Sequence, residues 1–144
     1  MSPALRAHFA DYATFHATPG NQACHYVAVP VIVLTVLALL SQVPLFDVSG
    51  FTVTLAEVVL VLVTVYYLTL DPPLAALMLV ASAVFIWIGR SLPWTVSLGL
   101  FVGAWVLQFI GHYVYEHKSP AFFRNLTHLL VGPLWVLAKA TGRA

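Results

Sequence analysis

Long hydrophobic runs separated by a few polar residues dominate the chain. Charged residues leave uncharged intervals at 12–46, 58–70, 72–89 and 91–115, filled mostly with Leu, Val, Ala, Ile, Phe and Trp. A bilayer core about 30 Å thick needs roughly 20 helical residues at about 1.5 Å rise each. The pattern therefore predicts four transmembrane helices, over residues 26–42, 51–70, 74–89 and 94–115.

Two further segments flank these predicted spans. Residues 4–17 carry apolar side chains at helical spacing, namely Leu5, Phe9, Tyr12 and Phe15. This pattern is typical of an amphipathic helix in the membrane interface. Near the other end, the uncharged run at 125–138 contains Gly132 and Pro133, and it is too short to cross a bilayer. We therefore expect an interfacial or re-entrant helix over 121–139.

Composition indicates a membrane protein rather than a soluble one. Of the 144 residues, 61% are hydrophobic and 8% are charged, and a soluble domain of this length cannot bury that much apolar surface. The formal net charge of +1 excludes nucleic-acid binding, because no Lys and Arg cluster could neutralise several phosphates. We predict an all-α integral membrane protein with a single membrane domain over 1–144. Its architecture is a bundle of about four transmembrane helices with interfacial or re-entrant terminal helices.

Basic residues beside the spans predict the orientation of the chain. With the N-terminus inside, four crossings leave five basic residues on the cytoplasmic side, namely Arg6, Lys118, Arg124, Lys139 and Arg143. Arg90 alone lies opposite. An even number of crossings also returns the end of the fourth helix to the face where the first begins. Polar residues at these two ends are therefore expected to meet.

Two polar motifs occupy these two ends. The first, HATPGNQACHYVAVP, contains His16, Asn21 and His25. The second, QFIGHYVYEH, contains Gln108, His112 and Glu116 at spacings of four, which places them on one stripe of an otherwise apolar helix. Such a stripe faces the bundle interior, a cavity or a bound ion, because exposing it to lipid would be costly. Gly111 beside it allows close approach of a neighbouring helix.

Histidines in these motifs predict a metal site. Neutral imidazole is the usual nitrogen ligand for Fe, Zn, Cu and Ni. The candidate ligands are His16, His25 and His112, with His117 and His128 as further candidates. Glu116 is either a ligand or a carboxylate that orients an imidazole. Asn21 and Gln108 are expected to support the site.

The residues themselves leave several functions open. One is a bis-histidine haem protein, with His25 and His112 as axial ligands. Another is a zinc-dependent lipid amidase or other hydrolase, in which Glu116 acts as general base. A third is a membrane scaffold whose histidines only bridge helices.

The order of polar residues also resembles a known family. The stretches FADYATFHATPGNQACHYVAVP, QFIGHYVYEHKSPA and HLLVGPLW are similar to those of the 2-hydroxy-fatty-acid dioxygenase family of small multi-pass membrane proteins, long catalogued as a domain of unknown function. The similarity extends from Phe9 to about Trp135. The two polar motifs are specific because so little else in the chain is polar, whereas the middle helices match only in being hydrophobic.

This resemblance implies an Fe(II)-dependent enzyme of fatty-acid α-oxidation. Such an enzyme uses O2 to cleave C1–C2 of a 2-hydroxy fatty acid and to release an acid one carbon shorter. The family's essential histidines fall on His16, His25 and His112 of this chain, and we expect Glu116 to complete the catalytic set. Many relatives have Lys or Gly where this chain has His117, and many lack a histidine at the position of His128.

Substrate and location follow as expectations from the same resemblance. The acyl tail would lie among the apolar helices, and Lys118 or Arg124 would attract the substrate carboxylate. The expected partners are a 2-hydroxy fatty acid, O2 and the lipid bilayer, and a homo-oligomer is left open. Short loops and the lack of a retention signal favour a bacterial inner membrane, or the endoplasmic reticulum membrane in a eukaryote. The metal site would lie near the cytoplasmic face.

Overall fold

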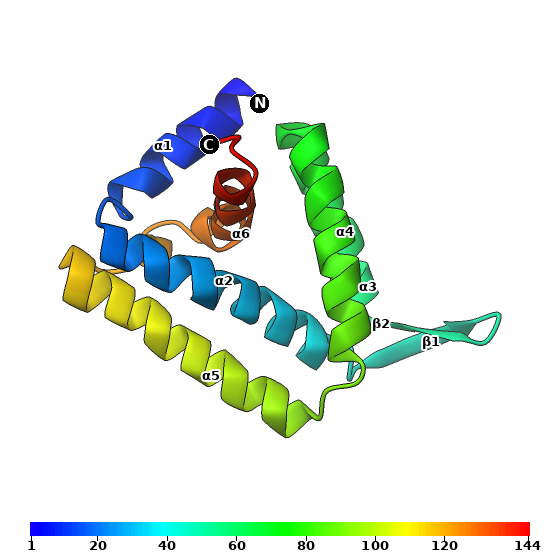
Figure 1. The fold of residues 1–144 in the computed structure, drawn as a ribbon. Helices are drawn as coiled ribbons and strands as arrows, with labels where there is room; N and C mark the ends of the chain where they lie inside the picture. The colour runs from blue at the N-terminus through cyan, green and yellow to red at the C-terminus, as the bar shows by residue number, and fades with distance from the viewer. The chain divides into compact units, whose positions relative to one another are not determined.

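The computed structural model describes residues 1–144, and their regular secondary structure is helical apart from one short hairpin (Figure 1). The helices are α1 (Pro3–Thr14), α2 (Pro19–Leu40), α3 (Leu55–Leu70), α4 (Pro72–Gly89), α5 (Trp94–Ile110) and α6 (Thr127–Ala140). A π-helix η1 (Gly111–Glu116) follows α5 directly, and a 3-10 turn η2 (Ala121–Phe123) precedes α6. The strands are β1 (Pro44–Val48) and β2 (Phe51–Thr54). The predicted all-α class is confirmed.

Three helices have the length and apolar character needed to cross a membrane. They are Pro19–Leu40, Pro72–Gly89 and Trp94–Glu116. Helix α3 is equally apolar but has only 16 residues. These properties identify a membrane protein, whereas the number of crossings and their orientation stay predictions.

The helix that contains the first predicted span begins before it. Helix α2 starts at Pro19 rather than at residue 26, so Asn21 and His25 lie inside its first two turns. Proline is favoured at the first position of a helix, where its missing N–H has no helical partner anyway. The hydrophobic run marks only the apolar part of this helix, and its polar first turns carry the site residues.

The second predicted span begins too early. Residues 51–54 pair antiparallel with β1 instead of starting a helix, as their β-branched and aromatic side chains favour. The turn uses Ser49 and Gly50, whose φ values of 49° and 84° lie in the left-handed region that tight hairpin turns require. Helix α3 therefore starts at Leu55. Figure 1 shows the hairpin extending away from the α3–α4 pair.

Helix α1 ends at Thr14 and not at 17, α4 begins at Pro72 and not at 74, and two boundaries in the C-terminal part also differ from prediction. The end of the fourth span, predicted as a regular helix over 94–115, changes at Gly111 into the π-helix η1, a form that often occurs at functional sites. The backbone N–H of Lys118 donates to the His112 carbonyl at 3.1 Å. The segment predicted as one helix over 121–139 is divided into η2 and α6.

The chain folds into two compact units. One comprises Met1–Pro30 with Gly103–Ala144, and the other comprises Val31–Val102. In the first, α1 packs on α6, with Leu5, Leu134 and Val131 almost fully buried. In the second, α3 packs on α4 around a core of Leu37, Ala56 and Ile86. The predicted site residues all belong to the first unit, so that unit positions the site.

Candidate metal centre

Three histidines from separate elements meet in the first unit. His16 lies in the loop after α1, His25 in the second turn of α2 and His112 in η1. Their nearest ring nitrogens all lie within 4.8 Å of one another, and the residues are 2%, 1% and 3% exposed. The structure thus brings together the two polar motifs, as the sequence predicts, and the enclosed ring nitrogens form a candidate metal centre.

Backbone carbonyls fix the tautomers of two of these rings. His16 Nδ1 lies 2.7 Å from the Tyr12 carbonyl oxygen, and His25 Nδ1 lies 2.9 Å from the Asn21 carbonyl oxygen. A carbonyl only accepts, so each Nδ1 must carry the proton and each Nε2 of a neutral ring presents a lone pair. The two Nε2 atoms are 2.9 Å apart. Two lone pairs at that distance repel unless a cation or a shared proton lies between them.

The spacing of these nitrogens suits a metal ion. Metal–imidazole bonds are about 2.0–2.1 Å long, so two such ligands at a right angle are separated by about 3 Å. The His16–His25 distance matches this value. His112 Nδ1 is buried without a hydrogen-bond partner, which is costly unless a metal ion accepts its lone pair. Three neutral imidazoles form a donor set suited to Fe, Zn, Cu or Ni.

Burial keeps His16 neutral. Removal from solvent, reinforced by the nearby His25, lowers the pKa of His16 from 6.5 to about 3. Its ring also stacks on Tyr12, with centroids 3.9 Å apart and planes 11° from parallel. The imidazole therefore holds the uncharged form and the fixed orientation that a metal ligand needs.

The metal-free protein is expected to lose stability as the pH falls. The unfolded chain binds a proton at His16 near pH 6.5, whereas the folded chain binds it only near pH 3. Stability is therefore full above the unfolded pKa and decreases as the pH drops below it. Between about pH 7.5 and about pH 5, this shift alone lowers the free energy of unfolding by about 2 kcal/mol. Thermal unfolding in detergent measures this loss, and His16→Asn should reduce it. Equal melting temperatures at both pH values in the unmutated protein would contradict it.

Both carboxylate oxygens of Glu116 accept hydrogen bonds from the loop that follows His16. Its Oε1 accepts from the Ala17 N–H at 3.1 Å, and its Oε2 accepts from the Thr18 N–H at 3.0 Å and the Thr18 hydroxyl at 2.9 Å. A carboxylate is favourable there, just before α2, because the helix dipole is positive at that end. Of the two roles predicted for Glu116, this placement favours orientation, since it fixes the loop that carries His16.

Asn21 connects the three segments that carry the histidines. It is fully buried, and its side-chain amide donates to the Phe15 carbonyl at 2.9 Å and to Glu116 Oε2 at 3.1 Å. Its own carbonyl holds His25. Gly111 permits this contact, because a Cβ there would lie 2.5 Å from Asn21 Oδ1. The predicted close approach at Gly111 is confirmed.

The other predicted site residues lie outside the histidine cluster. His117 is exposed and ends η1 with φ at 54°. His128 is buried, but its Nε2 lies 2.8 Å from Asp11 Oδ2 and links α6 to α1. Gln108 is half-buried, with its Oε1 lacking a hydrogen-bond partner one turn before His112. Neither His117 nor His128 therefore joins the group that could hold a metal.

Sequence reasoning missed two aromatic residues at the centre. Tyr12 was expected to be an interfacial apolar side chain, yet it is 4% exposed and covers the His16 ring. Trp135 is 2% exposed, with its ring 5.3 Å from Tyr12 and 6.0 Å from His16. The spacing of four between Tyr12 and His16 could have suggested the first contact. Nothing in the sequence pattern points to Trp135.

Comparison with known proteins identifies the family of this chain. A family model described as "2-hydroxy-palmitic acid dioxygenase Mpo1-like" matches residues 3–144. The chain belongs to the Mpo1-like family. Its sequence is 30% identical over 131 residues to the protein named 2-hydroxy-palmitic acid dioxygenase MPO1 of Saccharomyces cerevisiae, covering 88% of this chain and 73% of the yeast protein. No solved structure matches the chain.

Membership of the Mpo1-like family confirms the resemblance seen in the sequence. The matched region includes α1, the start of α2, and η1. It therefore includes every residue of the histidine cluster and its supports. Family membership supports a dioxygenase that acts on a 2-hydroxy fatty acid, for which this cluster is the candidate centre.

Proposed function

We propose that this Mpo1-like protein is an Fe(II)-dependent dioxygenase that cleaves C1–C2 of 2-hydroxy fatty acids with O2. The products are a fatty acid one carbon shorter, CO2 from C1, and water, which together balance the 2-hydroxy acid and one O2. The observation that supports a metal most strongly is the pair of Nε2 lone pairs held 2.9 Å apart by backbone carbonyls. Family membership supports the substrate and the use of O2.

His16, His25 and His112 are the residues that would hold the iron. When bound, Fe(II) supplies the one-electron and O2 chemistry that amino-acid side chains lack. Three protein ligands would leave the metal accessible to O2 and to the 2-hydroxy acid. We assign no ligand role to Glu116, whose oxygens accept hydrogen bonds from the loop before α2.

The surrounding residues prepare the ligands. The Tyr12 and Asn21 carbonyls keep the proton on Nδ1 of His16 and His25, so each Nε2 stays available. The rings of Tyr12 and Trp135 exclude water from one side of His16. The hydrogen bond between Asn21 and Glu116 holds the start of α2 against the end of η1. This support limits the reorganisation needed when metal and substrate bind.

We further propose that the site lies near the cytoplasmic membrane face. The histidines are at the start of α2 and in η1, at the ends of apolar helices and not at their middles. The excess of Lys and Arg on the same side of the predicted topology supports the cytoplasmic assignment. A fatty acid in the bilayer would thus present its polar head to the centre while its tail stays in lipid.

The alternative functions receive less support. A haem needs its two axial imidazoles on opposite faces of the macrocycle. The rings of the expected axial pair, His25 and His112, have centroids 4.9 Å apart, and the His16 ring lies within 4.9 Å of both, which leaves no space for a macrocycle between them. A zinc hydrolase needs a general base beside the metal, and both Glu116 oxygens already accept backbone hydrogen bonds. A scaffold would not need opposed Nε2 lone pairs. The Fe(II) dioxygenase is therefore the function we propose.

Elemental and product analysis test the proposal together. The protein is purified in detergent, its metals are determined, and metal-free samples are reloaded anaerobically with Fe(II) or Zn(II). We expect bound iron, no Soret band, and conversion of 2-hydroxypalmitate to pentadecanoic acid only with Fe(II) and O2. Hydrolysis of an N-acyl lipid amide with Zn(II) in the absence of O2 would favour the hydrolase. A Soret band would favour the haem protein, and a chain that binds no metal would favour the scaffold.

A further inference from the structure

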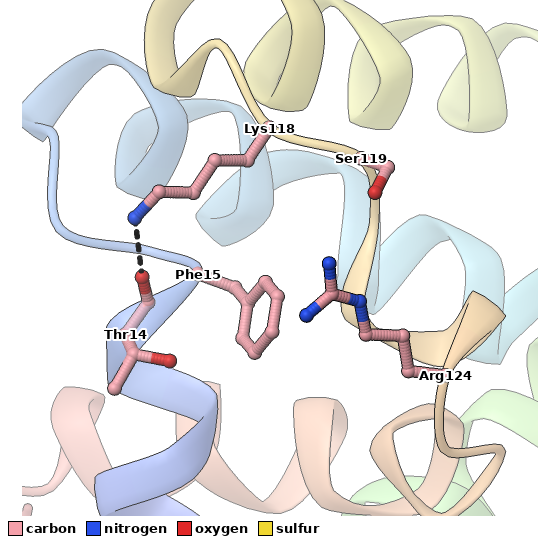
Figure 2. A pocket seen from close by; sticks show the side chains of 5 residues that line it. All are labelled: Thr14, Phe15, Lys118, Ser119 and Arg124. Atoms are coloured by element: carbon pink, nitrogen blue, oxygen red, sulfur yellow. Dashed lines mark hydrogen bonds between the residues drawn. The ribbon is translucent and has the colours of Figure 1, made fainter.

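A pocket formed by segments adjacent in sequence to the histidine cluster contains two cations that the metal centre does not use. Its volume is about 380 Å³, and it is lined by Thr14, Phe15, Lys118, Ser119 and Arg124. Figure 2 shows the Phe15 ring between the Lys118 and Arg124 side chains, with the Arg124 guanidinium turned toward the ring. This volume lies in the range of sites that bind small molecules.

The two cations have unused hydrogen-bond donors. Lys118 Nζ donates to the Thr14 carbonyl at 3.0 Å and is 4.0 Å from Glu116 Oε1, which leaves two of its three N–H groups free. The Arg124 guanidinium lies 5.9 Å from the centre of the Phe15 ring, and no carboxylate pairs with it. With Glu116 included, the pocket carries a net charge of about +1, which matches a single monoanion.

The pocket and the histidine cluster are built from the same segments. Phe15 is the neighbour of His16, and its carbonyl accepts the Asn21 side-chain amide. Lys118 follows Glu116 by two residues, and Glu116 fixes the loop after Phe15. The pocket and the cluster therefore share the loop after α1 and the segment after η1, while no histidine of the cluster lines the pocket.

We propose that this pocket captures the carboxylate of the free fatty acid before the substrate reaches the metal. This inference rests on the proposed function and names a step that precedes its chemistry. The Lys118 ammonium and the Arg124 guanidinium attract the carboxylate, and the Phe15 ring contacts the first methylene groups of the chain. A phospholipid phosphate offers similar charge, but the pocket has one aromatic face and a volume suited to a single-chain head group.

Binding measurements without turnover test the capture site. Metal-free protein in a neutral detergent is titrated with palmitate, which lacks the reacting hydroxyl, and with methyl palmitate, which lacks the charge. We expect palmitate to bind about tenfold more tightly, as charge-assisted hydrogen bonds predict. The double variant Lys118→Met with Arg124→Met should lose this preference. Arg124→Lys should keep most of it, because the charge remains.

Arg6→Met is the matched control. It removes one exposed cation from the same unit, where the Arg6 side chain donates to the Met1 carbonyl, and it should preserve the preference for palmitate. Equal binding of the two ligands to the unmutated protein would overturn the proposal, as would a preference that survives in the double variant. Displacement of palmitate by phosphatidylglycerol, but not by phosphatidylcholine, would also overturn it by showing a general site for anionic lipids.

Kinetics separate this inference from the proposed function. In an active preparation, the double variant should raise KM for 2-hydroxypalmitate about tenfold while kcat stays within about twofold. A loss of kcat with unchanged KM would contradict capture. If palmitate binding depends on Lys118 and Arg124 but no shortened acid forms under any condition, the capture site stands and the dioxygenase assignment fails.

Discussion

Alanine at His25 or at His112 is expected to abolish both metal binding and turnover. Each substitution removes one of three nitrogens that lie within 4.8 Å of one another, and two imidazoles cannot replace the chelation of three. Loss of a partner in the outer shell of a metal typically costs 10–100-fold in affinity or activity. For a direct ligand we expect bound metal at background level and turnover reduced by more than about 100-fold.

His117→Ala is the matched control for these two variants. His117 follows the same π-helix but is exposed and outside the cluster, so its replacement should leave bound metal and turnover unchanged. Metal content of the purified variants and formation of pentadecanoic acid provide the measurements. Full metal and full turnover in His25→Ala or His112→Ala would refute the assigned centre. A collapse in His117→Ala would show that the ligand set is wrong.

Gly111→Ala is expected to damage the centre without touching a histidine. The new Cβ would lie 2.5 Å from Asn21 Oδ1 and 3.1 Å from the Cys24 Cβ, closer than packed atoms normally approach. Asn21 cannot swing away, because its amide is held by the Phe15 carbonyl and Glu116. Overpacking of this kind costs about 1–3 kcal/mol. The shift of Asn21 also moves the carbonyl that orients His25, so we expect metal affinity to fall about 10–100-fold.

Gly103→Ala should stabilise the protein, in contrast to Gly111→Ala. Gly103 belongs to α5, the same continuous helix, but a Cβ there meets nothing within 4 Å. Replacing a helical glycine by alanine stabilises by about 0.5–1 kcal/mol. Melting temperatures and iron titrations of the two variants make the comparison. If both changes stabilise, or if Gly111→Ala binds iron normally, the close contact with Asn21 does not govern the centre.

Much of the fold could be predicted, because membrane helices follow directly from apolar runs. The errors lie where a helix boundary depends on something other than hydropathy. Helix α2 extends seven residues before the predicted start at 26, since proline at the helix start and a distant carboxylate stabilise its polar turns. The hairpin at 44–54 replaces the first residues of a predicted helix. This error arose because a short, uniformly apolar stretch shows neither a helical nor a strand periodicity.

The convergence of the histidines was predictable, because they lie near the start of the first predicted span and near the end of the fourth. The orientation of each ring was not, because backbone carbonyls fix it and carbonyls have no sequence signature. The role of Glu116 was also left open, because its hydrogen-bond partners Ala17 and Thr18 lie 99 and 98 residues away in the sequence. Long-range partners of this kind require the folded structure.

The short length of α3 has a consequence for the bilayer itself. The start of α2 contacts the end of η1 through Asn21 and Glu116. If α2 and α5 both cross the bilayer, these two ends lie on one face, so α3 and α4 either both cross or both return. If both cross, the 16 residues of α3 cover about 24 Å at about 1.5 Å each, less than a typical hydrocarbon core of about 30 Å. We then expect hydrophobic mismatch, with lipid thinned around α3 and a preference for membranes of short acyl chains.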